Sequence, residues 1–448
     1  MQIIVALFIK ISGTSFTIRQ MASVAIVQWL LSLILFKIFF GIPLISIPNV
    51  FTGLVLLFNC GQLIMNGFGI KGRVPLPFQR YGNAIVVKNS FFFYLFAQLF
   101  CALAISISDL YQINNSPYKG KQSNIDNTDK LCKVFLLFGF IPRIYIDIRS
   151  LIACLNKGYA GVYTLYFPQY IQTVAFFFDV GLVLLLFFLK NEKYKKRILF
   201  ICVLLYKCIM MLSGARQDKV AFLLVWFYLF FFVTASVNIW KIIFLGVCGV
   251  IGMTALSVIT YTRAGGISNI STIVACLKDE VIGHMIGNIM GEFGASFDTL
   301  EIVMNFVPEF VPYGLGKSYL AGLLSVVPLL VSHISPLSKY SVFLQLIPGR
   351  VTYAMGGSFL GEFYFNFSWI GLLGCVVLGF VLYRLYFVIS NTQANNIQKA
   401  WNSIVLIELI LFVRGYFTDM VQKLVWVYIF FRLCDWYFTK RSHCVQNV

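Results

Sequence analysis

The chain has 448 residues, of which 59% are hydrophobic and only 12% carry a charge. Because a soluble domain carries roughly 25% charged residues, this composition excludes a soluble globular protein and indicates an integral membrane protein. The net charge of +18 does not indicate nucleic-acid binding, since many of the 35 Lys and Arg residues lie in short loops between apolar segments. Cytoplasmic loops of membrane proteins carry such an excess of positive charge.

Successive apolar segments, separated by short polar stretches, are each long enough to cross a bilayer as a helix, which takes about 20 residues. A membrane barrel would instead show alternating segments of about ten residues. We therefore expect an all-α polytopic membrane protein with about 11–12 transmembrane helices. The predicted spans are 22–42, 48–68, 91–108, 130–152, 169–190, 197–213, 219–235, 240–260, 358–388, 401–416 and 420–437.

The region 261–357 is less apolar than its surroundings and rich in Gly, Pro and Tyr. It is typical of one large external loop that contains short helices. The chain therefore divides into an N-terminal transmembrane bundle (1–260), the large loop (261–357), and C-terminal transmembrane helices with a tail (358–448).

The orientation follows from the basic stretch Lys190–Arg197, which the positive-inside rule assigns to the cytoplasm. Counting spans from there puts the large loop outside and the C-terminal tail inside. The same count puts the basic loop 71–90 outside, against the rule. Either residues 2–18 enter the membrane, or one N-terminal segment does not cross it fully.

Several arginines fall near the external ends of predicted spans, where the positive-inside rule expects few: Arg143, Arg149, Arg216, Arg263, Arg350 and Arg414. A guanidinium group binds phosphate with two parallel hydrogen bonds and stays charged in partly apolar surroundings. The set therefore favours binding of an anion such as a lipid diphosphate. The alternative is structural pairing with Asp147, Asp218 or Asp419.

Glu362 is a carboxylate inside the apolar segment 358–388, and Asn366 follows it by one helical turn. An ionisable group at that depth usually faces a protein interior or a wet cavity and marks function. Glu362 is thus a candidate general base, and a structural hydrogen-bonded pair with Asn366 is the alternative. Glu292 and His333 in the large loop are further candidate bases. An ordinary interfacial role is the alternative for His333.

The eleven cysteines are scattered, mostly in apolar segments, and no pair has the spacing of metal ligands. With only three histidines in the chain, we expect no metal site and no cofactor.

Three motifs resemble those of the Wzy-type O-antigen and oligosaccharide repeat-unit polymerases. The first is Ser213–Arg216, which opens a span, and the second is Thr262–Gly266, which opens the large loop. The third, Gly357–Phe367 followed by Gly371, is similar to the family's late signature, except that Ser368-Trp369 stands where glycine is usual.

This resemblance implies a metal-independent glycosyltransferase of the bacterial inner membrane, with a fold similar to the GT-C class and an active site that faces the periplasm. It would transfer a glycan from one undecaprenyl diphosphate to the terminal sugar of another, and a chain-length regulator is an expected partner. The predicted catalytic residues are Glu362, Glu292 and His333. The predicted substrate-binding residues are Arg149, Arg216, Arg263, Arg350, Arg414, Asn366 and Tyr353.

Two other functions remain open on the same architecture. One is the ligase that moves finished O-antigen onto lipid A core, which shares the need to bind a lipid diphosphate. The other is a flippase for lipid-linked oligosaccharides or another transporter. A transporter is expected to show internal repeats, and the sequence shows none.

Overall fold

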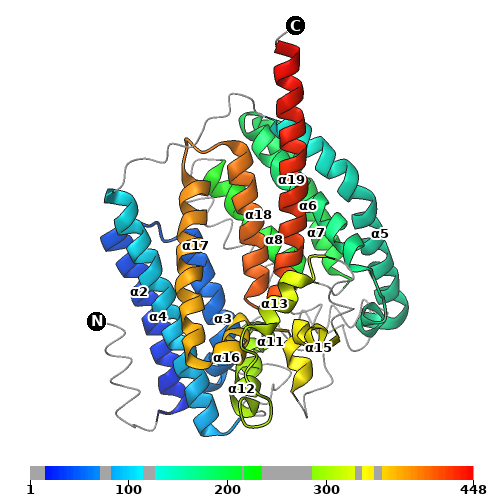
Figure 1. Ribbon diagram of the computed structural model, residues 1–448. Helices are drawn as coiled ribbons and strands as arrows, with labels where there is room; N and C mark the ends of the chain where they lie inside the picture. The colour runs from blue at the N-terminus through cyan, green and yellow to red at the C-terminus, as the bar shows by residue number, and fades with distance from the viewer. Residues whose placement is uncertain are drawn as a thin grey trace. The chain divides into compact units, whose positions relative to one another are not determined.

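The computed structural model describes residues 16–70, 82–114, 127–213, 216–234, 285–327, 335–347 and 356–446. Within these ranges every regular element is a helix, as Figure 1 shows, which confirms the predicted all-helical class. The predicted span 240–260 lies outside the described residues.

The helices before the large loop are α2 (Ile18–Phe40), α3 (Ile47–Gly67), α4 (Ala84–Asn114), α5 (Thr128–Tyr163), α6 (Gln169–Phe188), η1 (Leu189–Asn191), α7 (Lys193–Met211), α8 (Gln217–Tyr228) and η2 (Leu229–Val233). The later ones are α11 (Met285–Phe293), α12 (Ser296–Phe306), α13 (Lys317–Leu324), α15 (Ser335–Ser338), η3 (Lys339–Leu346), α16 (Phe359–Phe367), η4 (Ser368–Gly371), α17 (Leu372–Ser390), α18 (Asn396–Phe412) and α19 (Phe417–Gln446).

The chain divides into two compact units. The first comprises residues 1–118, 282–387 and 412–421, and the second comprises 119–281, 388–411 and 422–448. In the first unit α2, α3 and α4 lie side by side, and in the second α5 packs along α6 (Figure 1). The predicted division at residues 260 and 357 follows the membrane topology along the chain, and it stays a prediction.

Local sequence signals explain where α2 begins and ends. Thr17 caps its N-terminus, since its hydroxyl accepts a hydrogen bond from the Gln20 N–H at 3.3 Å while the Gln20 side chain accepts one from the Thr17 N–H at 2.9 Å. Gly41 ends the helix with φ +62°, a conformation that glycine adopts without strain. The exposed faces of α2 are apolar at Ile34 and Ile38, as a helix against lipid requires.

Among the described residues, five segments are long and apolar enough to cross a membrane: Ile18–Phe40, Ile47–Gly67, Ala84–Tyr111, Gln169–Asn191 and Phe359–Ser390. They match predicted spans and support a multi-pass membrane protein. Other predicted spans are also helical, but their helices are shorter or more polar. For example, α7 begins with a run of lysines and α18 has 17 residues.

The predicted span 358–388 is helical but interrupted. Ser358 caps α16 by accepting a hydrogen bond from the Gly361 N–H at 3.4 Å, and α16 ends at Phe367. Ser368 then adopts φ +52°, and the chain passes through η4 into α17. Gly371 is needed at this break, because a Cβ there would lie 2.4 Å from the Phe363 carbonyl oxygen.

The packing of α5 on α6 depends on glycine at position 139. A Cβ on Gly139 would lie 2.1 Å from the backbone nitrogen of Phe178, so the two backbones touch at this point. Replacement by alanine must push the helices apart, because backbone atoms cannot rotate away as a side chain can.

We therefore expect Gly139→Ala to destabilise the protein by about 1–3 kcal/mol, the usual cost of overpacking. The measurement is the thermal unfolding midpoint of the purified protein in detergent. Leu137→Ala is the matched control, since Leu137 lies on the same helix with 73% of its surface exposed. Equal midpoints for the two variants would contradict this account of the α5–α6 contact.

Candidate functional site

Glu362 lies on α16 with only 1% of its surface exposed, and both of its carboxylate oxygens accept hydrogen bonds. Ser318 of α13 donates its hydroxyl proton to Oε1 at 2.6 Å. The backbone N–H of Phe417, at the start of α19, donates to Oε2 at 3.0 Å. One carboxylate thus joins three helices that are far apart in the sequence.

Asn366 belongs to the same cluster and is completely buried. Its amide nitrogen donates to the Ser318 hydroxyl at 2.7 Å and to the Glu362 carbonyl at 2.8 Å. Its amide oxygen accepts from the Gly316 N–H at 3.0 Å. The two residues therefore meet through Ser318, an arrangement close to the structural alternative that the sequence left open. Because each Glu362 oxygen already has a donor, this geometry favours Glu362 as a group that holds the site in place.

Arg414 lies in the turn between α18 and α19, directly beside the residues that lead into α16. A Cβ on Gly356 would lie 2.8 Å from Nε of Arg414, and one on Gly357 would lie 2.5 Å from the Gly415 carbonyl oxygen. The first unit therefore gathers Arg414, Glu362 and Asn366 around one turn, although about 50 residues separate the first from the other two.

The other predicted residues are distributed differently. Arg149 is exposed on α5, with its guanidinium carbon 5.9 Å from the centre of the Tyr145 ring. Arg216 is 7% exposed and immediately precedes α8. Glu292 belongs to α11. The remaining residues lie outside the described ranges: Arg263, His333, Arg350 and Tyr353.

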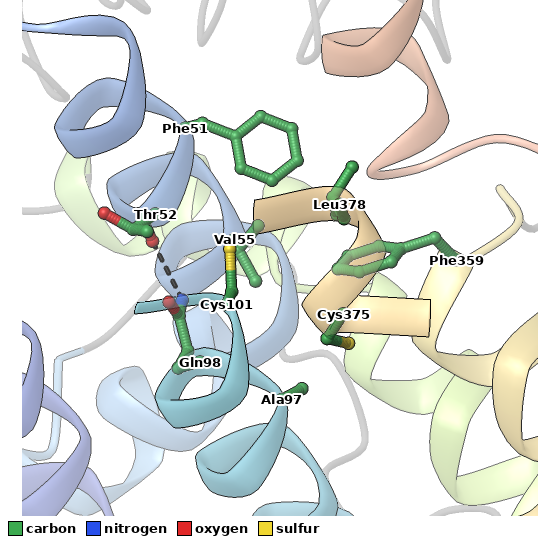
Figure 2. A pocket seen from close by; sticks show the side chains of 9 residues that line it. All are labelled: Phe51, Thr52, Val55, Ala97, Gln98, Cys101, Phe359, Cys375 and Leu378. Carbon is green, nitrogen blue, oxygen red and sulfur yellow. Dashed lines mark hydrogen bonds between the residues drawn. The ribbon is translucent and has the colours of Figure 1, made fainter. Parts of the chain in front are cut away.

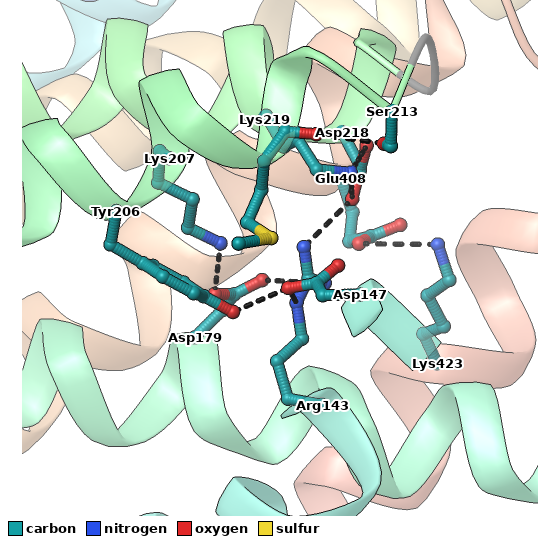
Figure 3. Close-up of polar contacts among 11 residues, drawn as sticks. Arg143, Asp147, Asp179, Tyr206, Lys207, Ser213, Asp218, Lys219, Glu408 and Lys423 are labelled. Carbon is teal, nitrogen blue, oxygen red and sulfur yellow. Dashed lines mark hydrogen bonds and ion pairs between the residues drawn. The ribbon is translucent and has the colours of Figure 1, made fainter. Parts of the chain in front are cut away.

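The second unit contains a buried network of charges, shown in Figure 3. At its centre Arg143 of α5 forms ion pairs with Asp147 at 2.9 Å, Asp179 at 3.5 Å and Asp218 at 3.2 Å. Lys207, which has no exposed surface, pairs with Asp179. These carboxylates come from α5, α6 and α8, and Lys207 comes from α7, so the network joins four helices.

Further charges extend this network. Lys219 lies 3.3 Å from Asp218, and Tyr206 donates a hydrogen bond to Asp147. Glu408 of α18 pairs with Lys423 of α19 at 3.8 Å. For Arg143, the structural pairing that the sequence offered as the alternative to anion binding is the one observed. The sequence did not point to Lys207 or Asp179, since isolated charges in two separate apolar segments carry no pairing signal.

Sequence reasoning also missed two acids on α12, Asp298 and Glu301, which are 6% and 0% exposed. Asp298 accepts a hydrogen bond from the Gln62 amide of α3 at 3.1 Å. Neither carboxylate oxygen of Glu301 has a hydrogen-bond partner among the residues that the structure describes. Burial, and secondarily the nearby Asp298, raises the pKa of Glu301 from 4.5 to about 8. The i, i+3 spacing of two acids on a short, mostly apolar helix is the signal that could have found them.

A narrow pocket lies between α3, α4 and the α16–α17 segment (Figure 2). Its lining is mainly apolar, with Phe51, Val55 and Phe359 among the residues, and its volume is enough for about one water molecule. The Gln98 amide in its wall donates to the Thr52 carbonyl at 2.9 Å. None of the predicted site residues within the described ranges lines it, and its apolar lining does not provide the polar groups that a sugar or a diphosphate requires.

Comparison with known proteins identifies one family. The model of a family described as O-antigen polysaccharide polymerase Wzy matches residues 1–443, nearly the full chain. This match confirms the resemblance that the three motifs indicated. No curated protein and no solved structure matches the chain.

The buried ion network predicts a large effect of removing one partner. We expect Lys207→Met to destabilise the protein by about 3–5 kcal/mol, because it leaves the buried Asp179 short of a positive partner. The measurement is the thermal midpoint in detergent, together with the amount of protein in membranes. Lys133→Met is the control, since Lys133 pairs with Asp129 at 74% side-chain exposure, and exposed pairs contribute about 0–1 kcal/mol. A midpoint for Lys207→Met as high as that of the control would refute this account.

The raised pKa of Glu301 predicts how stability depends on pH. The folded state prefers the protonated carboxyl, so its contribution is fully present below the unfolded pKa of 4.5 and is lost as the pH rises through about 8. Glu301→Gln keeps the group neutral at every pH. We expect the thermal midpoint of the wild type to fall relative to that of Glu301→Gln between pH 5 and 8. Parallel curves for the two proteins would show that Glu301 has an ordinary pKa.

Proposed function

Because the chain belongs to the Wzy family of O-antigen polysaccharide polymerases, we propose that it joins lipid-linked repeat units by one defined transfer. The growing glycan leaves one undecaprenyl diphosphate and is attached to the terminal sugar of a second lipid-linked unit. Polymerisation of O-antigen repeat units by a multi-pass membrane glycosyltransferase is the general activity of the family. The carrier, the direction of transfer and the residues below are the specific content of the proposal.

The observation that carries the proposal is the grouping of Arg414, Glu362 and Asn366 in the first unit. Arg414 packs against Gly356, just ahead of α16, and Glu362 on α16 accepts a hydrogen bond from Phe417, directly after the turn that carries Arg414. Such a site can bind an anion at its edge and keep its own polar groups satisfied. Arg414 and the late-motif residues Glu362 and Asn366 lie in the same unit, although they belong to separate predicted spans.

The chemistry explains why arginine suits this task. Diphosphate is a good leaving group, so cleavage of the glycosidic bond between C1 and oxygen needs stabilisation of negative charge more than a protein nucleophile. We propose that Arg149, Arg216, Arg263, Arg350 and Arg414 bind the two diphosphates, and that the transfer does not depend on a metal ion. Tyr353 and Asn366 complete the proposed binding residues.

A general base deprotonates the acceptor hydroxyl, and direct displacement inverts the anomeric centre. Glu362, Glu292 and His333 are the bases that the sequence suggests. Each carboxylate oxygen of Glu362 accepts a hydrogen bond within the protein, which supports a positioning role for that residue.

The proposed topology puts this reaction at the periplasmic face of the inner membrane, on the same side as the large loop 261–357. A fold similar to the GT-C class and an associated chain-length regulator belong to the same proposal. Family membership favours a polymerase over a ligase or a flippase. A deletion strain separates the first two, since loss of a polymerase leaves lipid A core capped with one repeat unit, whereas loss of a ligase leaves lipid-linked polymer.

Substitution of the arginines tests the diphosphate role. We expect Arg414→Ala and Arg216→Ala to reduce polymer yield at least tenfold, with Arg414→Lys intermediate because lysine keeps the charge without the two-pronged geometry. The measurement is the ladder of O-antigen lengths made when each variant is expressed in the deletion strain. Arg384→Ala, an exposed arginine on α17 at the predicted cytoplasmic end, is the control. Wild-type ladders from every arginine variant would remove the basis of the proposal.

A further inference from the structure

Two buried glutamates of the first unit differ sharply in their surroundings. Glu362 on α16 has a hydrogen-bond donor on each oxygen. Glu301 on α12 is equally buried, yet neither of its oxygens accepts a hydrogen bond from any residue in the described ranges. The two helices pack against each other, so the difference arises within one small part of the unit.

An unpartnered carboxylate in a protein interior is costly. Loss of hydration without a compensating hydrogen bond costs several kcal/mol, and an unpaired charge costs more. Native proteins therefore satisfy nearly all such groups, and an exception requires an explanation. Either the carboxyl is neutral at rest, or its partner is a group that arrives with the substrate.

The neighbours of Glu301 do not supply that partner. Asp298, one turn earlier on the same helix, is itself an acid, and the Gln62 amide nitrogen is already committed to it at 3.1 Å. Among the described residues, the oxygen of the Gln62 amide has no hydrogen-bond donor either. The Glu301 carboxylate and the Gln62 amide oxygen are thus buried acceptors without a donor in the part of the chain that the structure describes. A sugar carries the complementary groups, since each hydroxyl is a donor.

The position of α12 connects this interface to the proposed site. Thr299, between the two acids in sequence, donates its hydroxyl proton to the Gly356 carbonyl at 2.9 Å. Gly356 is the residue against which Arg414 packs. Glu301 therefore belongs to a helix that is hydrogen-bonded to the segment carrying the proposed diphosphate ligand.

We propose that Glu301 is the general base of the transfer and that the acceptor sugar binds at the acidic face of α12. This inference rests on the proposed function. The acceptor hydroxyl gives its proton to the Glu301 carboxylate while its oxygen forms a bond to the anomeric carbon of the donor glycan. The bond from that carbon to the diphosphate oxygen breaks, and the electron pair leaves with the diphosphate. The carboxyl then releases the proton to water, which restores the base.

The complete burial of Glu301 suits this role. A transferase must activate a sugar hydroxyl without activating water, because water would hydrolyse the lipid-linked glycan instead of extending it. A base with no exposed surface meets water rarely and becomes accessible only when the acceptor displaces the groups that cover it. The raised pKa of Glu301 is consistent with a base that exchanges protons near neutral pH.

The experiment compares Glu301→Gln, Glu301→Asp and Glu309→Gln with the wild type in the polymerase deletion strain. Glu309 is an exposed acid just beyond α12 and serves as the matched control. We expect Glu301→Gln to accumulate normally, with a thermal midpoint at pH 8 no lower than that of the wild type, and to lose polymer at least 100-fold. Glu301→Asp keeps a carboxylate and is expected to retain part of the activity, whereas Glu309→Gln keeps all of it. General-base contributions of about 10²–10⁴-fold set this scale.

Polymer from Glu301→Gln within threefold of the wild type would overturn the inference. A thermal midpoint that falls together with activity would also overturn it, since that pattern indicates a structural role. If the glutamine variant fails to accumulate, Glu301→Asp decides: wild-type polymer contradicts the role, and reduced polymer at normal protein level supports it. A wild type that restores no ladder contradicts the proposed function itself, independently of Glu301.

Discussion

The cost of keeping a polar group away from water without a partner shapes this molecule more than any single contact. In apolar surroundings each carboxylate, guanidinium and ammonium needs a partner of opposite charge or a hydrogen bond. The second unit meets this requirement with Arg143, whose three ion pairs reach carboxylates on α5, α6 and α8. The first unit meets it with Glu362, which accepts from Ser318 and from the start of α19. In both units a buried charge decides which helices are neighbours.

The same requirement separates groups that build the fold from groups available for chemistry. Every nitrogen of the Arg143 guanidinium and both oxygens of the Glu362 carboxylate have a partner within the protein, which favours a structural role for both residues. Glu301 has no hydrogen-bond partner in the described part of the chain, and its burial favours the protonated form. Arg149 is exposed and its cation faces a tyrosine ring. Residues of one chemical type thus fall into two groups, those with partners inside the protein and those without.

Much of the fold could be predicted from the sequence, because hydrophobic length and helical caps are local properties. The spans 22–42, 48–68 and 169–190 fall within a few residues of α2, α3 and α6. The break at Ser368 was harder to foresee, since hydropathy does not change there and the backbone bend brings Gly371 close to the Phe363 carbonyl, an approach that the sequence does not reveal. The match to the polymerase family was foreseeable from three short motifs in order.

The candidate site was only partly predictable, because pairing is a property of three-dimensional neighbours. The sequence identified Glu362 and Asn366 as a pair but contained no sign that Ser318, more than 40 residues earlier, would join them. Likewise Arg143 stood out by its position in the topology, while its partner Asp179 lay unnoticed in another apolar segment. Glu301 was missed because its i, i+3 spacing from Asp298 indicates a shared helix face but not that the face is buried.

The two glycines ahead of α16 have a mechanical consequence. Gly357 lies against the carbonyl oxygen of Gly415, and Gly356 lies against both the side chain and the carbonyl oxygen of Arg414. Because neither glycine position has room for a side chain, a shift of α16 displaces the turn that carries Arg414. The separation between this turn and the late motif is therefore set by close packing, which varies little in a protein interior. A site built in this way keeps its spacing even as the helices around it adjust to substrates of different size.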